Sequence, residues 1–173
     1  MKSLIKKRTS VRNFTEETIA KGIIEEVLRD AQTAPSAGNL QPYRAYYTTD
    51  KKKIKQLANA AMGQSWIEEA PLVFVICENA LESCAKYTFR GSQYATQDAT
   101  IFSTFLDLLF VERGYGTCWV GAIMVDVVKM IMEIDILSRP LHFLVVGRTV
   151  GDKWGAVRGK SRRKPLHKVA IEK

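Results

Sequence analysis

Residues 93–113 are predicted to form a helix that is apolar on nearly every side. The large apolar side chains do not follow a single stripe; they are Ile101, Phe102, Phe105, Leu106, Leu108, Leu109, Phe110 and Val111. Gly114 follows and is typical of a helix end. Such a helix is stable in water only where protein covers every face. The chain must therefore bury this helix at the centre of a domain or cover part of it with a second subunit.

Helices and strands are mixed along the chain without a regular strand–helix–strand repeat. Strands are predicted at 43–49, 72–76 and 142–146, and 117–123 is predicted as a strand or a turn that starts a helix. Helices are predicted to begin at the N-cap residues Thr15, Asp50, Ser65 and Asp126. The pattern favours an α+β fold over a doubly wound sheet. No linker or internal repeat divides residues 1–173, so we predict one domain.

The chain lacks the features of a secreted or membrane protein. It has no apolar signal segment at its N-terminus, and its longest apolar region, 99–111, is interrupted by Ser103, Thr104 and Asp107. That region is too short to span a bilayer. The cysteines are odd in number and lack metal-site spacing: Cys77, Cys84 and Cys118. We therefore expect no membrane contact and a reducing, cytoplasmic compartment.

Positive charge is concentrated at the two ends of the chain. The net charge is +8, with +5 in residues 1–12 and +6 in residues 152–173, which leaves −3 for residues 13–151. Two basic ends could bind nucleic acid. The chain has no zinc finger, RNA-recognition sequence or basic helix with heptads, so no nucleic-acid partner is expected. The alternative is that both ends gather around one small anionic ligand.

The segment KRTSVRNF, residues 7–14, suggests what that ligand is. In an extended chain Arg8, Ser10 and Arg12 point to one side, and Thr9, Val11 and Asn13 point to the other. A row of guanidinium, hydroxyl and guanidinium suits a phosphate, which arginine binds through paired N–H donors. A solvated basic terminus is the other interpretation of the same residues.

Other site motifs are absent or incomplete. Residues 116–121 have the glycine spacing of a P-loop, but Ala122 and Ile123 stand where it requires Lys and Ser or Thr. His142 and His167 have no metal spacing, and His142 is predicted to be a satisfied core residue. No acid–base dyad is evident, so we assign no catalytic side chain and no metal. If the protein is an enzyme, a cofactor is expected to carry the chemistry.

Several segments together resemble the nitroreductase family of FMN-dependent oxidoreductases. They follow the family order and span nearly the whole chain: RTSVRNF at 8–14, PSAGNLQP at 35–42, QSWI at 64–67 with AP at 70–71, DA at 98–99 leading to GYGTCWVG at 114–121, and RKPL at 163–166. Each match alone is weak, but together they are specific.

The resemblance implies a fold and a site. The fold is a central mixed or antiparallel sheet flanked by helices, with a long buried central helix and an extended C-terminal arm. The partner is a second copy, with FMN at the homodimer interface. The implied FMN-binding residues are Arg8, Thr9, Ser10, Arg12, Pro35, Ser36, Ala37, Asn39, Val120, Gly121, Arg162 and Arg163.

The resemblance also distributes roles among these residues. Arg8 and Ser10 are expected at the FMN phosphate, with Arg163 or Arg162 reaching it from the C-terminal arm. Arg12 is expected beside N1 and O2 of the flavin, where a cation favours the reduced form. The 35–39 loop would contact the flavin bound to the partner, and Val120 and Gly121 would lie near its N5 edge.

The implied function is FMN-dependent oxidation of NAD(P)H, with hydride passing through flavin N5 to a small acceptor by a ping-pong mechanism. The acceptor could be a nitroaromatic, a quinone or another flavin. A flavin-binding protein without turnover, or different flavin chemistry such as reductive dehalogenation, are the alternatives. The pocket lid is expected to be minimal or formed by residues 84–93.

Overall fold

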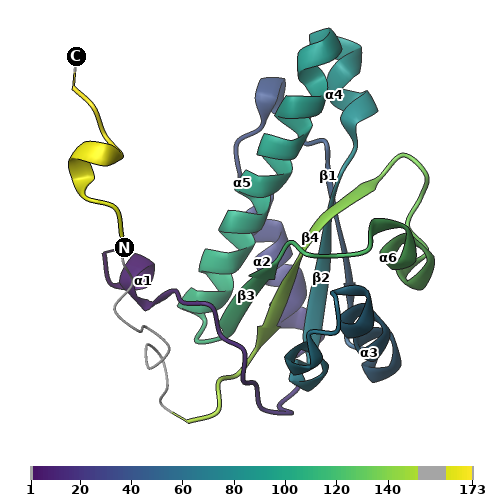
Figure 1. Cartoon of the computed structure of the whole chain (residues 1–173), viewed down its shortest axis with the longest axis vertical. Helices are drawn as coiled ribbons and strands as arrows, with labels where there is room; N and C mark the ends of the chain where they lie inside the picture. Colours follow the sequence, from purple (N-terminus) through teal and green to yellow (C-terminus); the bar gives the residue numbers. More distant parts are fainter. Residues whose placement is uncertain (1, 152–162, 173) are drawn as a thin grey trace.

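The computed structural model describes residues 2–151 and 163–172 and is built around one four-stranded sheet (Figure 1). The order across the sheet is β1 (Tyr43–Thr48), β2 (Leu72–Glu78), β4 (Arg139–Gly147) and β3 (Gly116–Val120). Each neighbouring pair is antiparallel. The predicted α+β fold with a central antiparallel sheet is confirmed, and the ambiguous segment after Gly116 is a strand.

Helices cover both faces of the sheet (Figure 1). Their bounds are α1 (Lys2–Lys7), α2 (Lys21–Ala31), α3 (Lys51–Ala60), α4 (Ala80–Tyr87), α5 (Gly91–Glu112) and α6 (Val125–Met132), with the short turns η1 (Ala37–Asn39), η2 (Ser65–Glu69), η3 (Thr88–Arg90) and η4 (Leu166–Lys168). Alternate residues of β2 enter two separate cores. Val73 and Val75 pack with α3 and α6, whereas Leu72 and Phe74 pack with α2 and α5.

Helix α5 corresponds to the apolar helix predicted at 93–113. It begins two residues earlier and ends one residue earlier than predicted. Phe102, Leu106 and Phe110 are buried in the core that α5 shares with α2 and the sheet. Its outer flank is only half covered by the described residues. An apolar cavity of about 300 Å³ lies there, lined by Leu4, Phe105, Leu108, Leu109 and Glu112. The central position is confirmed, and the flank leaves room for a further covering surface.

Two predicted helix caps are wrong. The Thr15 hydroxyl accepts from the Glu17 amide at 3.4 Å, but no helix follows: the chain bends at Glu16, and α2 begins only at Lys21, after Ala20. The Thr15 amide also donates to the Arg148 carbonyl at 2.9 Å, which ties this residue to the chain after β4 rather than to a helix. Ser65 makes no capping hydrogen bond and lies inside η2, after Gln64.

Helices do begin at or close to the other two predicted N-cap residues. The Asp50 carboxylate accepts a hydrogen bond from the Lys52 amide at 2.8 Å, so its N-cap role is confirmed. Asp126 lies in the first turn of α6 rather than at its cap, which is Met124. Residues 84–93, one candidate for a lid, form the end of α4, η3 and the start of α5. No helix among the described residues is long and apolar enough to cross a membrane.

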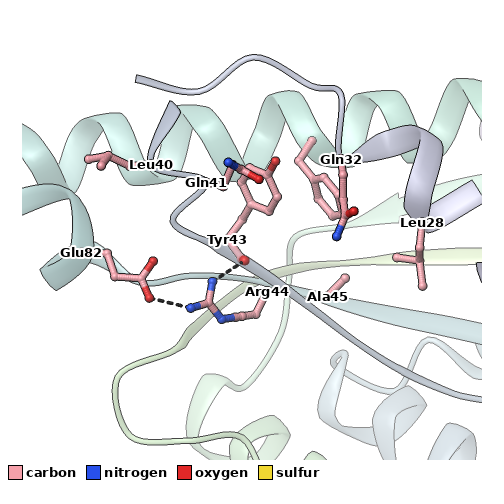
Figure 2. A pocket seen from close by; sticks show the side chains of 9 residues that line it. Leu28, Gln32, Leu40, Gln41, Tyr43, Arg44, Ala45 and Glu82 are labelled. Atoms are coloured by element: carbon pink, nitrogen blue, oxygen red, sulfur yellow. Dashed lines mark hydrogen bonds and ion pairs between the residues drawn. The ribbon is translucent and has the colours of Figure 1, made fainter. Parts of the chain in front are cut away.

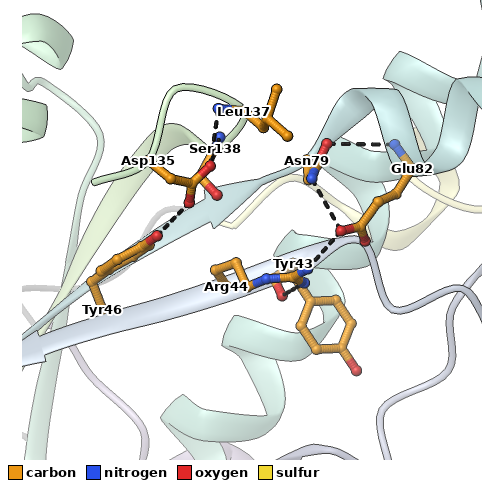
Figure 3. Close-up of polar contacts among 8 residues, drawn as sticks. All are labelled: Tyr43, Arg44, Tyr46, Asn79, Glu82, Asp135, Leu137 and Ser138. Atoms are coloured by element: carbon orange, nitrogen blue, oxygen red, sulfur yellow. Dashed lines mark hydrogen bonds and ion pairs between the residues drawn. The ribbon is translucent and has the colours of Figure 1, made fainter. Parts of the chain in front are cut away.

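Polar contacts fix strand β1 to its surroundings (Figure 3). Arg44 pairs with Glu82 of α4 at 2.5 Å, and Glu82 also accepts from the Asn79 side chain at 3.0 Å. On the same strand, the Tyr46 hydroxyl donates to Asp135 at 2.5 Å. The hydrogen bond from Tyr46, with others from neighbouring residues, lowers the pKa of Asp135 to about 2. These contacts hold β1 between α4 and the turn that leads into β4.

Candidate functional site

The N-terminal segment runs extended beside strand β3. Ser10 forms a parallel bridge with Thr117, and the Val11 amide donates to the Thr117 carbonyl at 2.8 Å. These bonds fix segment 8–12 at the edge of the sheet. The extended conformation predicted from the alternating sequence is therefore present.

The two sides of this segment differ as the alternation predicts, with one exception. Thr9 and Val11 are buried, whereas Arg12 is exposed and Arg8 keeps 31% of its side chain exposed. Asn13 is exposed, although the alternation placed it on the inner side. The two arginines and the hydroxyl between them thus lie along one accessible edge.

Arg8 faces a buried carboxylate, Asp107 of α5. Its Nη1 atom lies 3.9 Å from Oδ2 of Asp107, whose side chain is only 5% exposed. The Thr117 hydroxyl donates to Oδ1, and Trp119 Nε1 donates to Oδ2 at 3.1 Å. Burial raises the pKa of Asp107, and the contacts from Thr117, Arg8 and Trp119 offset only part of that rise. The phosphate end of the predicted site therefore contains a negative group as well as a cation.

Behind this carboxylate lies a neutral polar pair. The Trp119 ring stacks on the His142 ring at a centroid distance of 4.1 Å and an angle of 11°. His142 Nε2 lies 2.8 Å from the Ser103 hydroxyl oxygen, and burial lowers the pKa of His142 to about 4. His142 is thus a satisfied core residue, as predicted, and is uncharged at neutral pH.

The other end of the segment borders an aromatic ring and open space. The Arg12 guanidinium carbon lies 5.7 Å from the centre of the Trp66 ring, which limits its orientation. Val120 ends β3, and a Cβ added to the exposed Gly121 would meet no atom within 4 Å. Cys118 is buried, and burial raises its thiol pKa despite the nearby arginines. Cys118 is therefore a packing residue rather than a nucleophile.

The 35–39 loop is held at a different place on α5. The Ala37 amide donates to both carboxylate oxygens of Asp98 at 3.1 Å, and Asp98 is buried. Burial raises the Asp98 pKa, and the bond from Ala37 lowers it in part. Gly38 has φ 56°, and a Cβ there would overlap the Tyr87 side chain. Asp98 and this glycine together fix the loop against α4 and α5.

The loop and the arginine segment do not meet within one chain. Their contacts on α5, Asp98 and Asp107, are nine residues apart. Nine helical residues correspond to about 13 Å along the axis and about two and a half turns. The two carboxylates therefore project from opposite sides of the helix. The predicted FMN-binding residues form two separate groups, each anchored by a buried aspartate.

The predicted arginines of the C-terminal arm are only partly described. Arg162 lies outside the described residues. Arg163 is exposed at the start of segment 163–172, which Figure 1 shows in yellow on the side of α1, apart from the sheet. Their assignment to a phosphate stays a prediction.

Three residues that shape this region are not predicted as site residues from the sequence: Asp98, Asp107 and Trp66. Asp107 had a signal, because a carboxylate inside an otherwise apolar helix must face either solvent or a buried partner. In the sequence it only interrupts the apolar region 99–111, and its partner is not evident there. Asp98 and Trp66 were part of recognised segments, but nothing in their spacing indicates which backbone or side chain they contact.

A separate cavity of about 500 Å³ opens beside β1 (Figure 2). Its lining combines apolar and polar side chains: Leu28, Gln32, Leu40, Gln41, Tyr43, Arg44, Ala45, Glu82 and Phe102. The Tyr43 ring stacks on Phe102, and its buried hydroxyl has no hydrogen-bond partner among the described residues. The cavity borders the 35–39 loop rather than the arginine segment, so it is no part of the phosphate end.

Comparison with known families gives a match over most of the chain. The family model described as "Nitroreductase family" matches residues 5–79 and 61–151. The chain is 36% identical over 96 residues to a Thermus thermophilus "NADH dehydrogenase", covering 54% of this chain and 47% of that protein. It is 27% identical over 161 residues to a Bacillus subtilis "FMN reductase [NAD(P)H]", covering 85% and 64%. The chain thus spans about half to two thirds of the length of these relatives.

Solved structures show the same fold. A nitroreductase family protein from Clostridium difficile 630 superposes with a TM-score of 0.83 at 26% sequence identity. The superposition covers 100% of this chain and 98% of that one. The two chains therefore share one fold over nearly all of their length.

Proposed function

The chain belongs to the nitroreductase family, and from this premise we propose that it is an FMN-dependent oxidoreductase that uses NAD(P)H as reductant. The name of the Bacillus subtilis relative supports both the cofactor and the reductant. The observation that carries the proposal is the accessible row of Arg8, Ser10 and Arg12 along β3. Bound FMN would supply hydride transfer from a nicotinamide to a small acceptor in two alternating half-reactions.

The residues on this edge fit a flavin phosphate. Arg8 offers a guanidinium fork and Ser10 a hydroxyl, which are donors that suit phosphate oxygens. Both residues keep part of their surface accessible. Arg163 or Arg162 would add a charge from the C-terminal arm. The open space beside Gly121 leaves room for a flat ring next to the backbone.

We further propose that two copies of the chain complete each site. The 35–39 loop cannot reach the arginine segment of its own chain, because Asp98 and Asp107 anchor them on opposite sides of α5. In a homodimer the loop of one copy can meet the arginine segment of the other. The half-covered apolar flank around Phe105 and Leu108 supports such an assembly.

The physiological acceptor is a small molecule in this proposal, and a nitroaromatic, a quinone or a free flavin would each serve. Side chains then bind, orient and exclude water, while protons come from solvent. The cysteines that the structure shows unpaired, Cys77, Cys84 and Cys118, fit a reducing compartment such as the cytoplasm.

The first expected result is that the purified protein binds FMN and that anaerobic NADH or NADPH bleaches the absorption of the bound flavin. Absorption spectroscopy with each nucleotide in turn gives the measurement. Re-oxidation by a quinone or a nitroaromatic then tests the second half-reaction. FMN that stays oxidised under both nucleotides would favour a flavin-binding protein without turnover.

The Arg12→Ala substitution is expected to lower the reduction potential of the bound flavin by a few tens of millivolts. Arg12 is held beside Trp66, further along the strand than Arg8. A cation near the ring stabilises the negative charge of reduced flavin, and about 30 mV corresponds to roughly 1.4 kcal/mol for a two-electron couple. Potentials are measured with FMN-saturated protein. Arg8→Ala is the control, and equal shifts in both variants would show that Arg12 does not lie beside the ring.

A further inference from the structure

Asp107 places a carboxylate at the phosphate end of the proposed site. It lies 3.9 Å from the Arg8 guanidinium, on the same side as Ser10, whose backbone pairs with Thr117. The two neutral donors on Asp107, the Thr117 hydroxyl and the Trp119 indole, come from β3. Arg8 is therefore positioned between a buried acid and the accessible edge where a phosphate would bind.

A bound phosphate would change the electrostatics of this acid. Arg8 partly balances the negative charge of Asp107 in the free protein. A phosphate monoester carries close to two negative charges at neutral pH and would share the same guanidinium. With 5% of its side chain exposed, Asp107 has little solvent to screen the repulsion. The two anions therefore compete for one cation.

We propose that Asp107 is a specificity-determining residue, whose carboxyl group weakens the preference for FMN over riboflavin when it is ionised and permits the full preference when it is protonated. The proposal rests on FMN being the ligand of this site. Asp107 acts through Arg8 and touches no reacting atom. It thus makes the selection of a phosphorylated flavin dependent on a proton held inside the protein.

The groups around Asp107 keep their charge state over the pH range of the test described below. The titratable and charged groups that the structure places beside Asp107 are Arg8 of the N-terminal segment, Cys118 of β3 and, behind Trp119, His142 of β4. Lysine and arginine side chains ordinarily stay charged between pH 5.5 and about 8.5. Burial keeps Cys118 and His142 neutral there, because it raises the pKa of the thiol and lowers that of the imidazole to about 4.

The sign of the effect follows from the burial of Asp107. Burial raises its pKa in the free protein, and a phosphate at Arg8 raises it further. Binding of FMN should therefore favour the protonated acid, and the affinity should fall as the pH rises through the pKa of Asp107. The phosphate itself ionises near pH 6, which strengthens binding as the pH rises. A comparison with a variant lacking the acid separates the two effects.

The test is the affinity of wild type and Asp107→Asn for FMN and riboflavin between pH 5.5 and 8.5, followed by flavin fluorescence. An asparagine can still accept from Trp119 and donate to the Thr117 hydroxyl, so the packing is kept. At pH 8 the variant should bind FMN at least about tenfold more tightly than wild type, the size of effect of one neighbouring charge. The difference should shrink toward low pH, and riboflavin should bind both proteins equally.

A second variant keeps the acid and removes one of its donors. Thr117→Val has the same shape, and it should favour the protonated acid, so that tight FMN binding persists to higher pH than in wild type. An Asp107→Asn protein that binds FMN as wild type does, or more weakly, at every pH would overturn the proposal, as would an unshifted profile of Thr117→Val. If wild type binds neither flavin, the proposed function itself fails. If wild type binds FMN and these profiles do not differ, only the role of Asp107 fails.

Discussion

Replacing Arg8 with alanine is expected to weaken FMN binding roughly ten- to a hundredfold, because the phosphate loses a charge-assisted partner worth about 1.5–3 kcal/mol. Riboflavin has no phosphate, so its affinity should change little. Titration of both flavins against wild type and variant, at the same salt concentration, gives the measurement.

Lys6→Ala is the matched control for this experiment. It removes one positive charge from the exposed end of α1, two residues before Arg8 and outside the extended segment. If Lys6→Ala weakens FMN binding as much as Arg8→Ala, the effect is general attraction rather than a specific contact. If wild type binds riboflavin as tightly as FMN, the phosphate assignment is wrong.

The second large effect concerns stability in acid. His142 has a pKa of about 4 in the folded chain, below its ordinary value of 6.5. Above pH 6.5 the imidazole is neutral in both folded and unfolded chains, so it adds no pH dependence. Between pH 6.5 and about 4 the unfolded chain takes up the proton first, which lowers the free energy of unfolding by about 3 kcal/mol in all. Below that range the loss levels off.

Urea unfolding of wild type and His142→Gln at pH 7 and pH 4 measures this contribution. Glutamine can bond the Ser103 hydroxyl but does not ionise, so the variant should lose about 3 kcal/mol less between the two pH values. Carboxylates that titrate in this range are present in both proteins and cancel in the comparison. His167→Gln, at an exposed position, is the control and should behave as wild type. Equal acid sensitivity in wild type and His142→Gln would contradict the assignment.

The sequence predicts the sheet and the central helix well, because their signals are local and strong. The apolar residues around Phe102 and Phe110 require a covered helix, and the run after Pro71 reads directly as a buried strand. Helix starts are predicted less well. Asp50 caps a helix as expected, but the Thr15 amide bonds to Arg148, a residue far along the chain, and no helix follows.

The candidate site shows the same division. The alternation of Arg8, Ser10 and Arg12 predicts an extended, one-sided segment, and the structure confirms that geometry. The sequence does not reveal that Asp107 lies beside Arg8, because that contact depends on how α5 is rotated against β3. Such contacts between distant segments depend on how the helices pack on the sheet, and they produce no periodic pattern in the sequence.

Because Asp98 and Asp107 anchor two different segments, the number of residues between them in α5 matters more than which residues they are. Adding or deleting one residue between them would turn one end of the helix by about 100° and shift it by about 1.5 Å relative to the other. The Ala37 bond to Asp98 and the Arg8 contact with Asp107 could then not both form. Engineering of this helix should therefore exchange side chains of similar volume between positions 99 and 106 and leave the number of residues unchanged.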